Sequence, residues 1–275
     1  MTKILVTGSK GFIGKQVLKQ LKKSEIVLDS INSKQIDLQN IKEVMKIKPA
    51  DIVIHLGGKT KKDLSKNEYF NNNVLGTLNI LEYCMEKNIK KLIFVSSYVY
   101  GNPKYLPIDE KHPVSPHNEY TKSKHLAEQL CEFYAKNYNL NVVILRPFNI
   151  FGKTSKGDFL ISNLFRSIKT NEKILIFNKN SKRDFLYIDD FVDVILEIKD
   201  LDIKFDIFNI GSGLSISFKE IINEIEKITS KKIDLEYREE QEIFIEEIRA
   251  DISKIKQKIK WNPKISISEG LQKCY

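Results

Sequence analysis

The sequence is poor in cysteine and has no long apolar run. Its three cysteines, Cys84, Cys131 and Cys274, are far apart and lack the paired spacing of a metal site, so we expect reduced thiols and no metal centre. No apolar stretch approaches the roughly 20 residues of a membrane span, and the basic N-terminus runs straight into a strand-like segment. We therefore expect a cytoplasmic protein that does not associate with a membrane.

Charge is not concentrated in one place either. The net charge is +9, but Glu and Asp are interspersed among the lysines, and the aromatic residues do not alternate with lysines along one face. This pattern argues against a nucleic-acid partner. With 275 residues, 41% of them hydrophobic and 29% charged, the chain has the composition of a globular protein with a sizeable core.

A glycine-rich turn follows the first apolar run. Residues 3–7 read as a buried parallel strand, and apolar residues at helical spacing begin at Ile13. Between them, Gly8 allows a tight turn, Gly11 lets backbone N–H groups approach a pyrophosphate, and Gly14 lets the helix pack close to the strand. Strand, turn and helix therefore come in the order of a dinucleotide-binding site.

Asp29 ends the next apolar run, residues 26–28, and lies 21 residues past Gly8. A carboxylate at this place accepts hydrogen bonds from the ribose 2′-OH and repels a 2′-phosphate, which favours NAD over NADP. Residues 30–34 offer hydroxyls and an ammonium that could host a phosphate, so NADP stays possible.

Tyr120 and Lys124 have the spacing that stacks two side chains on one face of a helix. A fixed cation favours a phenolate and lowers the pKa of a tyrosine, so we expect Lys124 to activate Tyr120. Such a tyrosine can take a proton from an alcohol while a nucleotide takes the hydride. The pair predicts nicotinamide-dependent oxidation of an alcohol.

Strand-like and helical segments alternate up to about residue 150, with further strands predicted at 51–56, 92–96 and 142–145. Alternation of this kind predicts an α/β fold of the Rossmann type, a doubly wound parallel sheet with helices on both faces. Shorter elements follow, including helices near 159–168 and 217–228 and strands near 174–177 and 207–210. We therefore predict a nucleotide-binding domain at 1–150 and a smaller substrate-binding lobe with late sheet elements at 151–275.

Eight motifs in order carry a family resemblance. They are Thr7-Gly8-x2-Gly11-x2-Gly14, His55-Leu56-Gly57-Gly58, Asn73-Val74-Leu75-Gly76-Thr77, Phe94-Val95-Ser96-Ser97, Val99-Tyr100-Gly101, Tyr120-x3-Lys124, the run from Arg146 to Gly152, and Arg183-Asp184-Phe185. Over nearly its whole length the chain resembles the extended short-chain dehydrogenase/reductases, above all the nucleotide-sugar epimerase and dehydratase branch. This resemblance implies NAD or NADP in the first domain, a nucleoside-diphosphate sugar in the second, and a homodimer.

The resemblance also implies the catalytic roles. Tyr120 would be the acid/base, and Lys124 its partner and a ligand of the nicotinamide ribose. A serine after the fourth strand would hydrogen-bond the reacting sugar oxygen. The family spacing counted forward from Phe94 in the strand selects Ser97, and the spacing counted back from the Val99-Tyr100-Gly101 motif selects Ser96. We favour Ser97, because the geometry of the strand fixes the first spacing, whereas only a loop fixes the second.

Binding roles follow by position. The resemblance assigns the cofactor to Gly8, Gly11, Phe12, Ile13, Gly14, Asp29, Asp37, Leu38, Leu56, Gly57, Asn73, Ser96, Tyr120, Lys124 and Pro147. It assigns the substrate to Ser97, Tyr98, Asn149, Arg183 and Arg238. Two of these residues have alternative roles: Asp37 could instead be a helix N-cap, and Arg183 a surface arginine paired with a neighbouring aspartate. Arg238 matches a second diphosphate ligand of the family only if an insertion is placed in the alignment.

Tyr98 and Val99 stand where the sugar dehydratases of this branch carry an Asp-Glu pair. Neither residue supplies the second acid and base that removal of water needs, so dehydration is disfavoured. The prediction is an NAD-dependent 4-epimerase acting by transient oxidation at C4. An NAD(P)H-dependent 4-ketoreductase of a 4-keto-6-deoxy sugar stays open, and so does a non-enzymatic NAD sensor or scaffold.

Overall fold

The protein was analysed as a computed structural model that describes residues 2–21, 26–31, 35–60, 64–153, 159–238 and 245–275, with the backbone alone for 26–31. The chain forms two compact units. The first consists of Met1–Gly101, Val114–Pro147 and Val192–Phe208, and the second of Asn102–Pro113, Phe148–Phe191 and Asn209–Tyr275. In the described part of the chain no helix is both long and apolar enough to cross a membrane.

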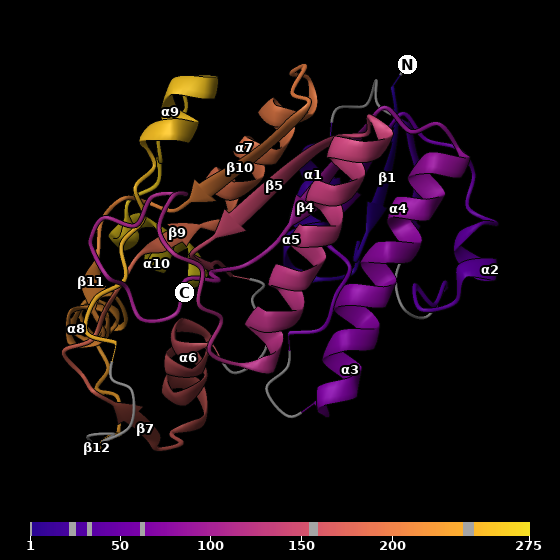
Figure 1. The fold of residues 1–275 in the computed structure, drawn as a ribbon. Coiled ribbons are helices and arrows are strands. Elements are labelled where there is room, and N and C mark those ends of the chain that lie inside the picture. Colours follow the sequence, from indigo (N-terminus) through magenta and orange to yellow (C-terminus); the bar gives the residue numbers. More distant parts are fainter. Residues whose placement is uncertain (1, 22–25, 32–34, 61–63, 154–158, 239–244) are drawn as a thin grey trace. The chain divides into compact units, whose positions relative to one another are not determined.

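The first unit contains the regular alternation expected from the sequence (Figure 1). Its elements are β1 Lys3–Thr7, α1 Phe12–Gln20, β2 Ile26–Ile31, α2 Ile41–Val44, β3 Ile52–His55, α3 Lys66–Phe70, a π-helical turn η1 Asn71–Leu75, α4 Gly76–Glu86, β4 Lys91–Val95, α5 Glu119–Tyr138 and β5 Asn141–Pro147. Helix α7 (Ile188–Lys199) and strand β10 (Phe205–Ile210) each begin in one unit and end in the other.

The central sheet has six strands in the order β10-β5-β4-β3-β1-β2. The pairs β1–β2, β1–β3, β3–β4 and β4–β5 are parallel. The chain leaves β1 to form β2 on one side and returns to form β3 on the other, so the strand order reverses at β1. In open sheets of this kind ligands bind at such a switch point, beyond the carboxyl ends of the strands. The predicted Rossmann-type fold is confirmed.

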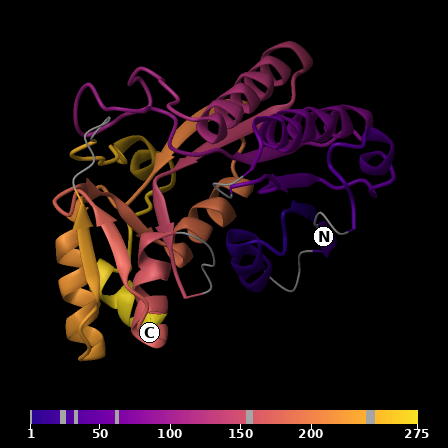
Figure 2. The same cartoon turned by 90° about the horizontal axis from the view of Figure 1, so that it is seen from below.

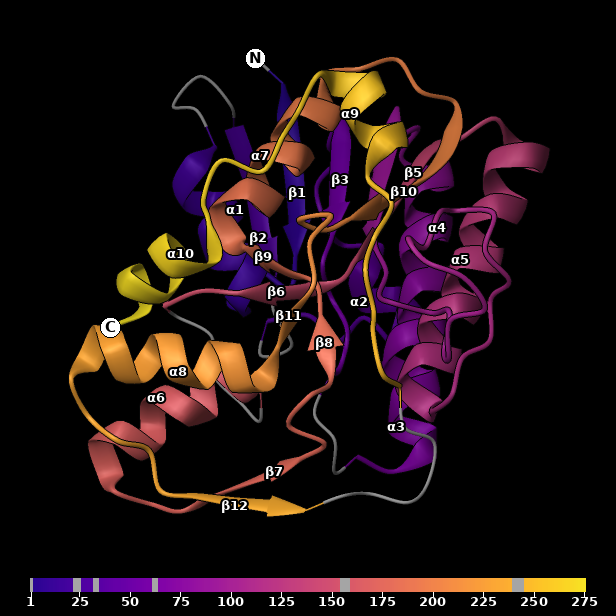
Figure 3. The ribbon, with the colours of Figure 1, turned by 90° about the vertical axis from the view of Figure 1, so that its left-hand side faces the viewer.

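Both faces of this sheet are buried, which explains its continuous apolar strands. Leu5, Val53 and Leu92 point to one face, where residues of α2, α4 and α5 complete a single core cluster. Ile4 and Ile54, the alternate residues, are also fully buried and point to the opposite face. Helix α1 and the part of α7 in this unit lie on that side (Figures 2 and 3).

The segment from 96 to 118 contains four prolines and forms no helix or strand beyond one isolated bridge between Ile108 and Ala250. It ends at α5, whose first turn is held by a reciprocal capping box between Asn118 and Thr121. The cap fixes the residue at which the helix begins. Tyr120 is therefore in the first turn of α5 and Lys124 one turn later.

The second unit is built from short elements. They are β6 Asn149–Phe151, α6 Leu160–Thr170, β7 Ile174–Phe177, β8 Lys182–Arg183, β9 Phe185–Tyr187, β11 Ile216–Ser217, α8 Phe218–Thr229, β12 Leu235–Arg238, α9 Ser253–Ile259 and α10 Ile267–Cys274. Strands β6–β9 and β7–β12 pair in parallel and β8–β11 antiparallel. The predicted nucleotide-binding domain at 1–150 and substrate-binding lobe at 151–275 stay a prediction.

Candidate active site

The turn after β1 has the geometry that requires glycine. Gly8 has φ +68°, and a Cβ there would lie 2.7 Å from the carbonyl oxygen of Leu56 in the loop after β3. A Cβ on Gly14 would lie 2.4 Å from the Gly8 carbonyl oxygen. Gly11 is the N-cap of α1 and has no side chain to accept from the first-turn N–H groups of Phe12 and Ile13. These groups and the helix dipole fit a pyrophosphate.

A buried histidine joins the ends of β1 and β3. The His55 ring nitrogens are hydrogen-bonded to Thr7 Oγ1 at 2.6 Å and Thr77 Oγ1 at 3.1 Å, and the Gly57 N–H donates to Thr7 Oγ1 at 3.0 Å. Burial and, to a lesser extent, the Lys124 charge lower the pKa of His55 to about 3. His55 is therefore neutral, and its hydrogen bonds hold the Leu56–Gly57 loop in place.

Leu38 also borders this loop, because a Cβ on Gly57 would lie 2.8 Å from Leu38 Cδ1. Its neighbour Asp37 is exposed and accepts a hydrogen bond from the Gln39 N–H at 3.0 Å. The N-cap of α2 is Asn40, whose side chain accepts from the Lys42 N–H. The helix-capping alternative for Asp37 is therefore wrong, because the N-cap lies three residues later at Asn40.

Asp29 is in β2, where its backbone pairs with Leu5 of β1. This places the residue beside the strand that leads into the glycine turn. Its side chain lies outside the described residues, and its contact with a ribose stays a prediction.

The Ser97 side chain lies close to the Tyr120 hydroxyl. Burial raises the pKa of Tyr120, the Ser97 hydroxyl lowers it, and Tyr69, whose ring centroid is 6.2 Å away, raises it slightly. The net direction is upward. Ser96 is buried and is not among the groups that shift the Tyr120 pKa, so this contact favours Ser97 as the catalytic serine, and the choice stays a prediction.

Lys124 does not act on the phenol as the sequence suggested. Its Nζ lies 4.2 Å from the centroid of the Phe94 ring, and the pKa of Tyr120 is raised rather than lowered. The expected direction was wrong because burial of the phenol is the largest influence on its pKa, and Lys124 is not among the groups that shift it. Burial also lowers the pKa of Lys124 to about 8, while Cys131 and Glu128 act in the opposite direction.

Asn73 connects the loop after β3 to the catalytic helix. Its Oδ1 accepts from the Lys59 N–H at 2.8 Å, and its Nδ2 donates to the Lys59 carbonyl at 3.2 Å and to Ser123 Oγ at 2.9 Å. Ser123 in turn donates to the Tyr120 carbonyl at 2.8 Å. The predicted cofactor residue Asn73 thus positions the first turn of α5, and Ser123 was not predicted.

Glu128 lies one further turn along α5 and was also missed. Arg146 donates to it twice, from Nε at 2.9 Å and from Nη2 at 2.7 Å, and donates to the Tyr100 hydroxyl at 2.8 Å. Burial works against ionisation of Glu128, but hydrogen bonds from His125 and Arg146 hold its pKa below the usual value. The spacing of 120, 124 and 128 on one helix face was the signal that could have revealed it.

Tyr98 and Pro147 lie near the carboxyl ends of β4 and β5. The Tyr98 hydroxyl donates to the Gly101 carbonyl at 2.6 Å, and its ring meets Tyr100 edge-on at 5.6 Å. Pro147 is the buried last residue of β5. The assigned contacts of Tyr98 with the substrate and of Pro147 with the cofactor stay predictions.

The remaining substrate residues belong to the second unit. Asn149 donates from its backbone N–H at 3.1 Å and from Nδ2 at 2.9 Å to the carbonyl of Asp184, next to Arg183. The Arg183 Nη1 donates to the carbonyl oxygens of Lys182 and Ile245, and its guanidinium lies 5.4 Å from the Phe218 ring.

Arg238 is not part of this group. It is exposed on β12, and its Nη2 lies 2.7 Å from Glu236 Oε1 in a surface ion pair. The structure therefore brings Asn149 and Arg183 together through Asp184 and leaves Arg238 on a separate two-stranded sheet.

Comparisons with known proteins give one consistent result. Residues 4–211 match the model of the NAD dependent epimerase/dehydratase family. A putative UDP-glucose 4-epimerase of Methanocaldococcus jannaschii is 31% identical, over 98% of this chain and 96% of the relative. A UDP-glucuronate 4-epimerase of Thermodesulfobacterium geofontis is 33% identical, over 93% of this chain and 80% of the relative.

Among solved structures, the fold is similar to that of the UDP-glucose 4-epimerase of Thermus thermophilus in complex with NAD. The TM-score is 0.86 at 21% identity, with 99% of this chain and 97% of the other covered. The similarity therefore extends through both units and beyond the residues of the family model.

Proposed function

The chain belongs to the NAD-dependent epimerase/dehydratase family, and we propose that it is a nucleoside-diphosphate-sugar 4-epimerase acting by transient oxidation at C4. The observation that carries this proposal is the placement of Tyr120 in the first turn of α5, close to Ser97, with Lys124 buried one turn later. Relatives named as UDP-glucose and UDP-glucuronate 4-epimerases support it.

The proton moves between the sugar and Tyr120. When bound, the oxidised nicotinamide supplies the hydride acceptor and a positive charge. Tyr120 takes the proton of the C4 hydroxyl and later returns it, and the Ser97 hydroxyl stabilises the phenolate by donating a hydrogen bond. Because burial raises the pKa of Tyr120, a positive charge in the loaded site would favour the phenolate.

Lys124 and the glycine turn would hold the nucleotide. The Lys124 ammonium suits the hydroxyls of the nicotinamide ribose, and the first-turn N–H groups of α1 suit the pyrophosphate. Leu38, Leu56 and Gly57 would line the pocket for the rest of the nucleotide. The fit of these residues supports NAD as the cofactor.

Two features argue against the other activities. The Tyr98 hydroxyl is committed to the Gly101 carbonyl, and no Asp-Glu pair stands at 98–99, so dehydration lacks its acid and base. The retained Tyr120, Lys124 and Ser97 argue against a non-enzymatic sensor or scaffold. A 4-ketoreductase would use the same three residues, and only the fate of the hydride separates it from an epimerase.

Asp29 should set the cofactor preference. We expect the unmodified protein to bind NAD more tightly than NADP, and Asp29→Ala to narrow that difference by about tenfold, because the variant loses charge repulsion against a 2′-phosphate. Isothermal titration of the unmodified protein and of the variant with NAD and with NADP measures this difference in affinity. Tighter binding of NADP than of NAD by the unmodified protein would refute this preference.

Arg183 should affect substrate binding more than chemistry. We propose that it pairs with the diphosphate, which is remote from C4 and so contributes binding that is uniform along the reaction. Arg183→Ala should raise KM by about tenfold or more with a smaller change in kcat. Arg238→Ala is the matched comparison, since Arg238 lies in an exposed ion pair with Glu236. The same variant tests whether Arg238 is a second ligand of the diphosphate. An Arg183→Ala variant with unchanged KM would remove Arg183 from the site.

We further propose a cytoplasmic homodimer. Helix α5 exposes Phe133 and Tyr138, whose ring centroids are 5.8 Å apart, and such an aromatic surface suits a second copy of the chain. Light scattering of the purified protein tests this, with twice the 32.0 kDa chain mass as the expected value.

A further inference from the structure

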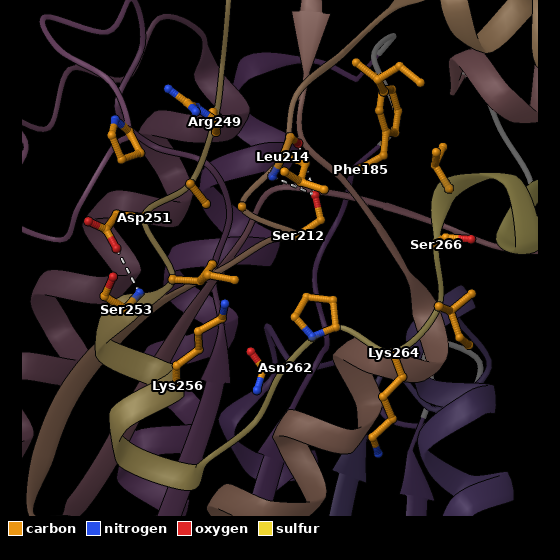
Figure 4. A pocket seen from close by; sticks show the side chains of 18 residues that line it. Phe185, Ser212, Leu214, Arg249, Asp251, Ser253, Lys256, Asn262, Lys264 and Ser266 are labelled. Carbon is orange, nitrogen blue, oxygen red and sulfur yellow. Dashed lines mark hydrogen bonds between the residues drawn. The ribbon is translucent and has the colours of Figure 1, made fainter.

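A cavity of about 690 Å³ lies wholly within the second unit and has no role in the proposed reaction. Its walls come from the loop after β10, from the segment that leads into α9 and from residues 262–267, which lead into α10 (Figure 4). Asn149, Arg183 and Arg238 do not line it, nor does any residue predicted to bind the cofactor. Its volume is typical of a site for a small molecule.

Two buried carboxylates hold these walls in place. Asp184 accepts hydrogen bonds from the backbone N–H groups of Ser212, Gly213 and Ala250 at 2.6, 3.0 and 3.1 Å. Asp190, which is 1% exposed, accepts from the N–H groups of residues 264 and 265 at 3.1 and 3.0 Å. Because buried acceptors fix backbone on opposite walls, the cavity is a built feature and not a gap between mobile loops.

The polar groups of the cavity favour an anion. Lys256 extends toward its middle beside Asn262, and Arg249 and Lys264 lie at its edges (Figure 4). The one carboxylate in the wall, Asp251, already accepts the Ser253 N–H at 2.8 Å. In the described part of the chain Arg249 Nε is buried without a hydrogen-bond acceptor, although its ion-pair partner Glu247 is 3.4 Å away.

The apolar groups favour a flat body attached to that anion. Phe185, Leu214 and Pro263 face the same space, and the Leu214 side chain is 73% exposed within the protein itself. An exposed leucine beside an aromatic ring provides a surface against which a planar group can pack.

We propose that this cavity binds a small organic phosphate with a planar ring, the chemistry of a nucleoside monophosphate, at a site separate from the residues assigned to NAD and to the sugar diphosphate. The phosphate would lie against Lys256 and Asn262, and the ring against Phe185 and Leu214. The affinity comes from combining the phosphate contact with the ring contact, because a lone lysine binds phosphate only weakly in water.

A tryptophan next to the cavity provides a fluorescence probe of binding. Trp261 is its single tryptophan, is 2% exposed and directly precedes the lining residue Asn262. Its Nε1 has no hydrogen-bond partner among the described residues. Tryptophan fluorescence of the full chain, titrated with uridine monophosphate, adenosine monophosphate, uridine and inorganic phosphate, therefore measures occupancy beside this wall.

We expect a saturable change with the monophosphates, and at least about tenfold weaker binding of uridine and of phosphate. Lys256→Ala should weaken monophosphate binding by about three- to tenfold. Lys258→Ala is the matched control, since Lys258 is an exposed lysine of the same short helix that does not line the cavity. Arg183→Ala should leave the response unchanged.

Three results would overturn the proposal. One is the absence of a fluorescence change and of heat in calorimetry with either monophosphate at millimolar concentration. Another is equal affinity in the Lys256→Ala and Lys258→Ala variants. The third is loss of the response in Arg183→Ala with circular dichroism unchanged, which would assign the nucleotide to the substrate diphosphate site instead.

Discussion

Replacing Tyr120 with phenylalanine is expected to reduce turnover by about 10²- to 10⁴-fold and to leave NAD binding nearly unchanged. The ring still packs at the start of α5, 6.2 Å from the ring of Tyr69, and only the proton carrier is lost. Steady-state kinetics and isothermal titration on the same preparation separate the two effects. Tyr138→Phe, which removes a half-exposed hydroxyl from the same helix, is the matched control and should keep its activity.

A Tyr120→Phe enzyme that keeps most of its kcat would remove the proposed proton path. The proximity of Ser97 to Tyr120 would then be a matter of packing alone. Loss of NAD binding together with activity would instead show that the hydroxyl is needed to shape the nucleotide site.

Replacing Asp184 with alanine is expected to lower the free energy of unfolding by at least about 3 kcal/mol. The side chain is fully buried, and its two oxygens accept from three backbone N–H groups and from Ser212 Oγ at 2.7 Å. Without the carboxylate, these donors remain buried and unpaired.

Urea unfolding followed by circular dichroism measures this effect. Asp234→Asn removes one charge at an exposed position of the same unit, and should change the stability by less than about 0.5 kcal/mol. Equal stability of the Asp184 and Asp234 variants would show that the loops around Asp184 are held by other contacts.

The regular first unit could be predicted from the sequence because its strands are buried on both faces. Continuous apolar runs at residues 3–7 and 142–145 identify such strands, and the glycine turn fixes where α1 begins. In the second unit, the two-residue strands β8 and β11 carry no periodicity that a sequence could show. Helix α7 was missed because its apolar residues follow directly on strand β9, without a turn to mark the boundary.

The residues of the active site were easier to predict than their electrostatics. The spacing of Tyr120 and Lys124 was sufficient to place both on α5. The pKa of Tyr120 depends on its burial and on Ser97 and Tyr69, which come from other segments of the chain. A pattern along one helix contains no measure of burial, so the sequence indicated the wrong direction for this pKa.

Incubation with nucleotide sugars and no added reductant tests the central claim most directly. Uridine- and thymidine-diphosphate sugars would be supplied with NAD alone, and in parallel with NADH or NADPH, while nicotinamide absorbance and product identity are followed. We expect two 4-epimers to interconvert with no net change in absorbance, because the hydride returns to the carbon that it left. Stoichiometric consumption of NADH or NADPH with a 4-keto sugar, and no epimer formed in its absence, would contradict the epimerase and establish the ketoreductase.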